Sequence, residues 1–554
     1  MTSPRRVLAL LVVLLTALSG CTVQEQPEEE TTPEPVEPAL PELDPDEGGG
    51  TLRIGLSSSP ASLDPRFVVD EEGELIVGAV FEPLVTLDER SEIVAGAAIR
   101  WEIDEEGREF TFHLRPASFH DGTPVTAEAF VRTFQRIADG TADPPSFLAY
   151  LLAPVEGIEE AQVDGTELIG VEAVDDRTLV IRTAEPEPGF LRALTNPSLV
   201  PTPPIADEDP AAFAAQPIGN GPFAVAAPRE PEDLFVRLAR VEGHHRGPQL
   251  DEVLFQIYAE DPGRERQWED LADGQLHVAE VPPERFAEAE ELYGRSRDGY
   301  RGPGLITGIT STVYLYGFET TREPFDDPVV RRAISLSIDR DAIADDVMQG
   351  IRAPADAIVP PPIPGSQRRP CDHCHHDPEA ARALLEEAEI ELEALTLTHN
   401  RGRTHAAIAE AMASDLEDAL GIEVSLQSMD LRPFVQAVRR GDVAVFRLGW
   451  EAGEPDPGAY LYPLFHSSEV GLDNLSRFED EEVDALLDEA RREADQRIAL
   501  SLYREAERLI LDQAPVIPLL WYRHSRVVAP DVNDLVLSPF GRIDLARVSL
   551  EPAS

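Results

Sequence analysis

The sequence predicts a mixed α/β protein that is built from at least two lobes and is preceded by an export leader. Segments with the two-residue period of strands and segments with the period of helices follow one another, most clearly between residues 390 and 450. The chain beyond residue 50 is about 500 residues long, which is more than one hydrophobic core usually organises. The first 50 residues differ in composition from everything that follows them.

The first 21 residues have the pattern of a lipoprotein export signal. Two arginines precede an almost wholly apolar run from residue 7 to residue 17, and Leu18-Ser19-Gly20-Cys21 forms a lipid-attachment box. The apolar run is too short to span about 30 Å of hydrocarbon as a helix, so a retained transmembrane anchor is the weaker interpretation. We therefore expect residues 1–21 to be a signal peptide. Lipid on Cys21 is expected to anchor the protein to the outer, extracytoplasmic face of the cell membrane.

Residues 22–50 predict a disordered stalk between the anchor and the folded lobes. They are rich in Glu, Pro and Thr, contain almost no large apolar side chains and end in three glycines. Such a segment cannot bury enough apolar surface to offset its chain entropy, and like charges and prolines keep it extended.

The whole chain is strongly acidic. It has 104 acidic and 47 basic residues, a net charge of −57, and all of the basic residues are arginines. A surface this negative repels nucleic acid, so no nucleic-acid partner is expected. The lack of lysine excludes a Walker-type phosphate loop and Schiff-base chemistry. Because the acids are spread along the whole chain, adaptation to a salty medium is the favoured explanation of the charge.

Local patterns place the first strands and a capped helix. Residues 51–56 alternate and predict a first strand, and residues 109–114 alternate more clearly, with three apolar side chains on one face. We expect Thr126 to cap a helix that follows a turn. Residues 177–182 predict another short strand.

The second half of the chain alternates helices and strands, as expected of an α/β protein. Asp327-Pro328 and Asp377-Pro378 each combine an N-cap with a proline in the first helical turn, and Thr404 is expected to cap a helix that Gly421 stops. The other expected elements are a helix from about Asp339 to Gly350, strands at 422–426 and 443–448, and helices at about 480–491 and 495–512.

Two cysteines lie close together in this half. If Cys21 is acylated, Cys371 and Cys374 remain as a pair in a compartment that permits disulfides. The surrounding sequence Cys-Asp-His-Cys-His-His also resembles a metal site, because thiolates and imidazoles suit zinc or nickel. No second pair of ligands with metal-site spacing is visible, and adjacent histidines cannot all reach one ion. We expect a local disulfide and no bound metal, with a metal site and free thiols as the alternatives.

Several motifs resemble one known family. Residues 107–116 and 119–127, GREFTFHLRP and FHDGTPVTA, closely resemble the most recognisable motif of the extracytoplasmic solute-binding proteins of peptide/nickel-type ABC importers, family 5, the oligopeptide- and dipeptide-binding group. Other blocks agree with that family in order: SLDP at 62–65, FEPL at 81–84, GNGP at 219–222, PFDDPVVRRAI at 324–334, DPEAARALL at 377–385, GW at 449–450, and residues 474–518. The resemblance covers nearly everything from Thr51 onward.

The resemblance implies a two-lobed fold of the periplasmic-binding-protein type (type II, large peptide-binding cluster), with an extra α/β subdomain on the first lobe. By that likeness, residues 51–92, 205–302 and 525–554 form lobe I, residues 93–204 form the inserted subdomain, and residues 303–524 form lobe II. The lobes are expected to close around the solute by a hinge motion.

The resemblance also implies a function and partners. We expect a monomeric binding protein that captures an oligopeptide or peptide-like solute and delivers it to a membrane permease, where separate ATPase subunits drive import. No cofactor is needed. Relatives with this architecture also capture nickel chelates, haem, sugars or opines, and a ligand-sensing lipoprotein is a further alternative. An enzyme is not expected, because the sequence has neither a GxSxG elbow nor an HExxH zinc motif.

In this family a peptide lies extended between the lobes, and the resemblance suggests which residues hold it. His405 and Arg447 match positions that contact a ligand carboxylate in oligopeptide-binding relatives, and a helix N-terminus and a guanidinium both suit an anion. The alternatives are a capping or surface histidine and a strand-surface ion pair. Trp450 is expected to offer an aromatic wall, with core packing as its alternative. Four more residues match ligand-lining stretches by position only: Tyr314, Tyr316, Val69 and Asp70.

One position departs from the family pattern. Relatives that grip a free α-amino group resemble Gly-Trp-x-Ala-Asp, whereas Gly453 stands here at the aspartate position. Glycine cannot pair with an ammonium group, so Glu451, Glu454 and Asp456 are the candidate substitutes, and Glu454 is the one we expect among the ligand contacts. The alternative is a solvated loop. The resulting hypothesis is a peptide-like ligand whose amino end is absent, blocked or read differently.

Overall fold

The structure, a computed structural model, describes residues 49–551 except residues 90, 231, 260 and 261. The predicted signal peptide, the lipidation site Cys21 and residues 22–48 of the predicted stalk lie outside the described residues. None of the described helices is long and apolar enough to cross a bilayer.

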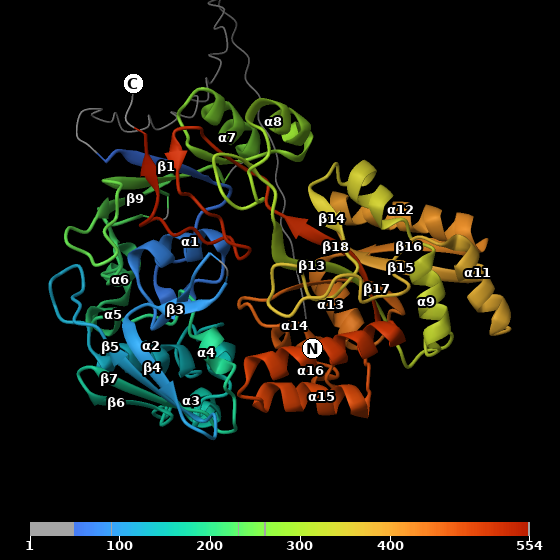
Figure 1. The fold of residues 1–554 in the computed structure, drawn as a ribbon, viewed down its shortest axis with the longest axis horizontal. Coiled ribbons are helices and arrows are strands. Elements are labelled where there is room, and N and C mark those ends of the chain that lie inside the picture. Colours follow the sequence, from blue (N-terminus) through green and yellow to red (C-terminus); the bar gives the residue numbers. More distant parts are fainter. Residues whose placement is uncertain (1–48, 90, 231, 260–261, 552–554) are drawn as a thin grey trace, which may run out of the picture. The chain divides into compact units, whose positions relative to one another are not determined.

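The first large sheet has seven strands (Figure 1). In spatial order they are β12 (Gly304–Ile306), β19 (Arg526–Val528), β11 (Val278–Glu280), β1 (Thr51–Leu56), β10 (Glu252–Ile257), β9 (Phe235–Arg240) and β8 (Phe223–Val225). The predicted first strand is confirmed with its bounds, and it runs parallel to β10 with Ile54 opposite Phe255. The helices of this part are α1 (Glu71–Val80), α5 (Ile205–Glu208), α6 (Pro210–Ala215), α7 (Gly263–Ala272) and α8 (Phe286–Tyr293).

A four-stranded sheet is formed by the segment between residues 98 and 182. Its order is β4 (Ala98–Ile103), β5 (Glu109–Leu114), β7 (Thr178–Arg182) and β6 (Val171–Asp175), and its helices are α2 (Ala127–Ala138), α3 (Ile158–Asp164) and α4 (Phe190–Ala193). A separate hairpin pairs β2 (Val85–Leu87) with β3 (Ile93–Ala95). The alternation predicted for β5 is confirmed, because Phe110, Phe112 and Leu114 are buried in one core with α2. Thr126 has the backbone of an N-cap, but its side chain makes no capping hydrogen bond, so that prediction is only half right.

The third sheet has six strands. Their order is β14 (Arg352–Pro354), β18 (Val516–Arg523), β13 (Ile309–Phe318), β17 (Val445–Glu451), β15 (Ala394–Asn400) and β16 (Glu423–Met429). Its helices are α9 (Pro328–Leu336), α10 (Arg340–Ala342), α11 (Pro378–Glu387), α12 (Arg403–Leu420), α13 (Leu431–Arg439), α14 (Gly458–Phe465), α15 (Glu481–Arg492) and α16 (Gln496–Gln513). A final hairpin pairs β20 (Val532–Asn533) with β21 (Ser549–Leu550).

Two local predictions in this sheet are wrong. Helix α12 begins at Arg403 after Gly402, so Thr404 lies inside the first turn instead of capping it. The helix expected from Asp339 is interrupted, because α10 is only three residues long and residues 343–347 continue it as a π-helical turn. The Asp327 and Asp377 caps are confirmed, since each carboxylate accepts a backbone N–H of its helix.

The chain passes directly between strands of the two larger sheets at two adjacent connectors. Residues 307–308 join β12 to β13, and residues 524–525 join β18 to β19. The backbone N–H of His524 donates to the carbonyl of Gly308 at 2.9 Å, so the connectors are hydrogen-bonded to each other. Tyr300 supports the same place, because its hydroxyl donates to the carbonyl of Ile309 at 2.6 Å.

Candidate ligand-binding site

A cavity of about 820 Å³ lies at these two connectors. Its wall combines the start of α1, the end of β11, the second half of β17 and the segment 522–526, so that both large sheets contribute. The loop from Pro539 to Arg542 completes the wall. Residues that are far apart in the sequence therefore meet around one space, as expected of a ligand site.

One side of this cavity is cationic. It contains Arg447 from β17, Arg352 from β14 and Arg523 from the end of β18. Two of the guanidinium groups are oriented by aromatic rings, since that of Arg352 lies 3.7 Å from the ring centroid of Tyr522 and that of Arg447 lies 4.9 Å from that of Tyr314. Among the described residues, no carboxylate forms an ion pair with any of the three arginines.

His405 stands behind the cationic side rather than on the cavity wall. It lies in the first turn of α12, and its Nδ1 is 3.1 Å from the hydroxyl of Tyr314. Burial and the positive charge of Arg447 lower the pKa of His405 to about 4. The imidazole of His405 is therefore neutral at pH 7. Tyr314 connects it to Arg447, because the hydroxyl of Tyr314 contacts His405 and the guanidinium of Arg447 covers the ring of Tyr314.

The opposite side of the cavity is acidic but largely neutralised. Arg526 donates to Glu71 at 2.6 Å and lies 3.4 Å from Glu280, and Arg542 lies 3.4 Å from Glu74. Glu451 has no such partner among the described residues. Burial raises the pKa of Glu451, and the negative charges of Glu71 and Glu74 raise it further.

The other predicted contacts are divided between the cavity and the core. Val69 is 54% exposed and lines the cavity, where Trp450 lies with its indole N–H donated to the carbonyl of Ala459 at 2.7 Å. Asp70 also lines the wall, but its carboxylate is already used, because it accepts the N–H groups of Gly73 and Ala61 at 2.8 and 3.1 Å. Two predicted residues are fully buried in the core of the six-stranded sheet and do not line the cavity: Tyr314 and Tyr316.

The loop around Gly453 is shaped by an arginine. Arg542 donates to the carbonyl of Gly453 at 3.2 Å. A β-carbon at Gly453 would have open space around it, since its nearest neighbour, Asn196 Nδ2, would be 4.0 Å away. Sterics therefore do not require glycine here, and the missing side chain is a difference in chemistry.

Of the two acidic residues in the loop after Gly453, Asp456 forms an ion pair and Glu454 forms none within the described chain. Asp456 pairs with Arg192 at 3.3 Å and accepts the N–H of Gly458 at 2.7 Å. Glu454 lies in a second cavity of about 700 Å³, and in the described chain its carboxylate has no ion-pair partner. Burial and the nearby acids Asp456 and Glu187 raise the pKa of Glu454 to about 7.

Comparison with known proteins identifies the family. A model of the bacterial extracellular solute-binding proteins, family 5, middle region, matches residues 92–471. The chain is a family 5 solute-binding protein. The predictions of this family, of a two-lobed α/β fold and of solute binding are confirmed, and the family is one of binding proteins that act outside the cytoplasm.

Two curated relatives cover most of this family 5 protein. It is 30% identical over 503 residues to the probable deoxycholate-binding periplasmic protein YgiS of Escherichia coli (strain K12), which covers 88% of this chain and 90% of the relative. It is 26% identical to the dipeptide-binding protein DppE of Bacillus subtilis (strain 168), with 97% of each chain covered.

Solved structures agree with the fold. The unliganded open form of the periplasmic murein tripeptide binding protein MppA has a TM-score of 0.79 at 26% identity, covering 90% of this chain and 97% of that one. HbpA2 from Haemophilus parasuis has a TM-score of 0.81 at 24% identity, covering 91% and 100%, and supports the fold alone.

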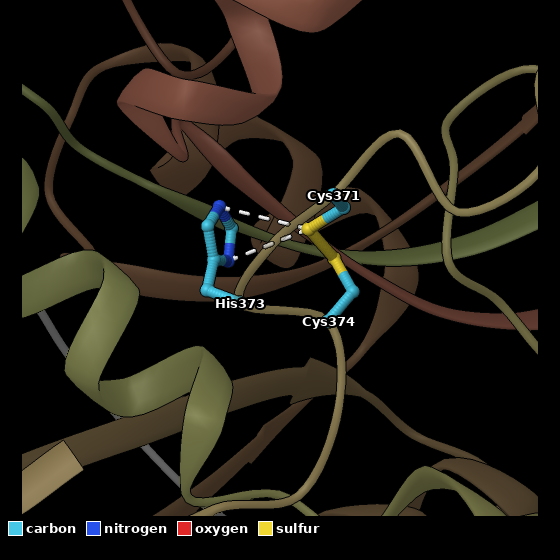
Figure 2. A group of neighbouring side chains, drawn as sticks. All are labelled: Cys371, His373 and Cys374. Atoms are coloured by element: carbon cyan, nitrogen blue, oxygen red, sulfur yellow. Dashed lines mark hydrogen bonds between the residues drawn. A yellow bond between two sulfur atoms is a disulfide. The ribbon is translucent and has the colours of Figure 1, made fainter. Parts of the chain in front are cut away.

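The cysteine pair of the family 5 protein lies apart from both cavities. Figure 2 shows Cys371 and Cys374 joined by a disulfide with the ring of His373 beside them. The Sγ of Cys371 is 3.5 Å from Nδ1 of His373, whose Nε2 donates to the carbonyl of Leu511 at 2.7 Å. Burial lowers the pKa of His373 to about 4. A metal here would need both sulfurs as thiolates, which the disulfide form does not supply.

Sequence reasoning missed a second cluster of metal-type side chains. The two carboxylate oxygens of Glu82 each lie 3.0 Å from Nε2 of His245, next to His244. Both nitrogens of His244 are already used, because Nε2 lies 3.1 Å from the carbonyl of Asn220 and Nδ1 accepts the N–H of Arg246. We interpret this cluster as a structural contact between the buried carboxylate of Glu82 and the exposed ring of His245.

Proposed function

We propose that this protein is the substrate-binding lipoprotein of an ABC importer and that it captures an oligopeptide or peptide-like solute in the 820 Å³ cavity. The observation that carries the proposal is Arg447, a guanidinium on the cavity wall whose Nε is buried and has no hydrogen-bond partner in the described structure. A half-buried guanidinium without a carboxylate partner is costly, and a ligand carboxylate would satisfy it. Relatives named as dipeptide- and oligopeptide-binding proteins support a peptide as the ligand.

The proposed mechanism is capture, closure and delivery. Residues 51–92, 205–302 and 525–554 would form lobe I with residues 93–204 inserted, and residues 303–524 would form lobe II. A solute that contacts both lobes favours the closed state by its differential affinity. The closed monomer would then dock on the permease, whose ATPase subunits drive import, while lipid on Cys21 keeps the protein at the outer face of the membrane.

The experiment that tests peptide binding is calorimetric titration with trialanine, its C-terminal amide and its N-acetylated form. We expect the free C-terminal carboxylate to bind at least about tenfold more tightly than the amide, as one charge-assisted contact allows. Arg447→Gln should abolish this preference. Arg297→Gln, a change at an exposed arginine outside the cavity, is the matched control. Equal binding of acid and amide would contradict the assignment of Arg447.

A non-peptide carboxylate is the second candidate. The observation in its favour is the 30% identical relative that is named as a probable deoxycholate-binding protein. The charged side chains on both sides of the cavity favour a ligand with opposite charges at its ends over a mainly apolar one. Mass spectrometry of solutes that co-purify with the protein distinguishes these candidates directly.

A further inference from the structure

The cavity holds more positive charge than one ligand carboxylate needs. Three of its arginines, Arg352, Arg447 and Arg523, form no ion pair with a carboxylate in the part of the chain that the structure describes. The remaining wall arginines are neutralised, because Arg264 and Arg526 pair with Glu280 and Arg542 pairs with Glu74.

Arg352 and Arg447 belong to one surface of the six-stranded sheet. Arg352 lies opposite Tyr522 in the β14–β18 pair, and Arg447 lies opposite Tyr316 in the β17–β13 pair. Directly opposed residues of antiparallel strands share a face, and each guanidinium covers a tyrosine ring of that face. The positive charges of Arg447 and Arg352 both help to lower the pKa of His405.

Arg523, at the end of β18, is the third wall cation without a carboxylate partner in the described chain, but it alternates with Tyr522 and so leaves the strand on the face opposite to Arg352. It follows Tyr522, the residue whose ring Arg352 covers, and it lines the same cavity. Its Nε is buried without a hydrogen-bond partner in the described structure. Burial lowers the pKa values of both Arg352 and Arg523. The positive charge of Arg295 lowers the pKa of Arg523 further, and the negative charge of Asp345, which forms no ion pair with Arg523, raises it.

These cations have an unmet electrostatic requirement. A guanidinium removed from water needs an anion or several acceptors, and stacking on a ring supplies only part of this. Arg352 donates to the carbonyl of its neighbour Ile351 at 2.9 Å and also contacts the side chain of Tyr522, and neither group is an anion at pH 7. The positive charge of Arg352 therefore has no anionic partner in the described chain, and a ligand anion could supply one.

We infer that the cavity takes a ligand with two anionic groups at one end, the first held by Arg447 and the second by Arg352. The ligand class is a peptide-like solute with an acidic C-terminal residue or an equivalent dicarboxylate. The inference rests on the proposed function for the position of the first carboxylate, and it assigns a second subsite beside it.

The test compares the tripeptides Ala-Ala-Asp and Ala-Ala-Asn, which differ only in the second charge, by calorimetric titration. We expect the aspartate peptide to bind at least about tenfold more tightly, because one well-made charged contact accounts for that factor. In Arg352→Gln this ratio should fall towards one, whereas Arg297→Gln should keep it. Circular dichroism of each variant shows whether it is folded. A wild-type ratio below about twofold, or a ratio that Arg352→Gln leaves intact, would overturn the inference.

A second pair of probes separates this inference from the peptide proposal. Glutarate and its monoamide, glutaramate, carry two charges and one charge, and neither is a peptide. If no tripeptide binds but glutarate raises the melting temperature more than glutaramate does, and Arg352→Gln abolishes the difference, then the peptide proposal fails and the second subsite stands. Equal effects of the two compounds, together with equal binding of the two tripeptides, would remove the subsite.

Discussion

Two ionisable side chains, Glu454 in the second cavity and His405 behind the wall of the first, have pKa values shifted from their ordinary values, and each shift has a visible cause. His405 is held neutral by burial and by Arg447, while Glu454 is held partly protonated by burial and by Asp456. The charge of such groups changes with pH and with the charge of a ligand. The pH dependence of stability and of binding therefore tests these single residues directly.

Glu454 should make the protein less stable as the pH rises. Its folded pKa of about 7 lies above the ordinary value of 4.5, so the folded state binds the additional proton between these values. The destabilisation is absent below about pH 4.5 and complete above about pH 7. Glu454→Gln should therefore be more stable than the wild type by about 1–3 kcal/mol at pH 8 and nearly equal to it at pH 5.

Urea unfolding of both proteins at the two pH values measures this difference. Glu105→Gln, a change at an exposed acid, is the control that should show no such dependence. If Glu454→Gln were equally stable or less stable than the wild type at pH 8, the charged form of Glu454 would not be destabilising.

His405 should couple ligand binding to proton uptake. The free protein has a pKa of about 4 there, with Arg447, His399 and Arg352 all opposing a positive charge. A ligand carboxylate beside Arg447 offsets these charges and raises the pKa, so binding takes up a proton and tightens as the pH falls. If the bound pKa returns to its ordinary value, affinity should be roughly tenfold higher at pH 5.5 than at pH 7.5.

Calorimetric titration of trialanine in buffers with different ionisation enthalpies detects the proton directly. His405→Gln should bind without this uptake, which separates it from titration of the acids across the cavity. Proton release by the wild type on binding would contradict the placement of the ligand carboxylate.

The sequence could predict single residues only where a local motif identified them. Trp450 was found because it belongs to the Gly449-Trp450 motif, and Arg447 because it lies two residues before that motif. Both residues line the cavity. Arg352 lies in the three-residue strand β14 and Arg523 ends the eight-residue strand β18. Neither residue stands in a motif, and the pairing of β14 with β18 brings both to the wall. Tyr314 and Tyr316 were expected at the ligand, but their strand is central and covered, so both rings are in the core.

Helix α1 shows how an element positions acidic groups in the cavity. Its N-cap, Asp70, satisfies the N–H of Gly73 and ties down Ala61, and the first turn presents Glu71 and Glu74 to the wall. An N-cap carboxylate compensates N–H groups that have no partner inside the helix.

Asp70→Ala should lower the free energy of unfolding by about 1 kcal/mol, because the cap is lost. Asp70→Asn should retain most of the stability, since asparagine is an equally good cap. Urea unfolding of the three proteins measures the order. If alanine were as stable as asparagine, the carboxylate would be serving the cavity and not the helix.

Elements were predictable where the pattern was local, and less so where tertiary contacts decide. The caps at Asp327 and Asp377 and the alternation of β5 needed only neighbouring residues. The interrupted helix after Asp339 did not follow from its sequence, because Arg340 is buried and donates to the carbonyls of Pro518 and Ser335 from other segments. Such a contact fixes the backbone from outside the helix.

The acidic excess of the molecule should make its stability depend on salt. The net charge of −57 opposes compaction by repulsion between surface carboxylates. Raising the salt from 0.1 M to 1 M shortens the screening length from about 10 Å to about 3 Å, so repulsion falls. We expect the melting temperature to rise with potassium chloride, by roughly 1 °C for each kcal/mol of repulsion removed from a folded part of about 500 residues.

Thermal unfolding at the two salt concentrations measures this effect, with sucrose at matched osmolality as the control for general exclusion effects. Buried pairs such as Arg136–Asp64 are screened much less than surface charges, so they should not offset the gain. A melting temperature that falls with salt would show that attractive surface pairs outweigh the net repulsion.

At the scale of the molecule, the sequence predicted the family and the class of fold, but not which strands meet. Motif order is a property of the chain alone, whereas the pairing of β1 with β10 joins segments about two hundred residues apart. The position of the cavity follows from that long-range pairing and from the two connectors. It therefore became visible only in the structure.

The hydrogen-bonded connectors have a consequence for engineering and ancestry. Ile306 and Arg526 are paired across β12 and β19. The segment between them, residues 307–525, therefore begins and ends at neighbouring positions of the seven-stranded sheet. If residues 307–525 were deleted and replaced by a short hairpin turn, β12 and β19 should still pair in the seven-stranded sheet. Because its ends are neighbours, the segment 307–525 is a candidate for circular permutation. The same arrangement is that of one domain inserted into another at a single site.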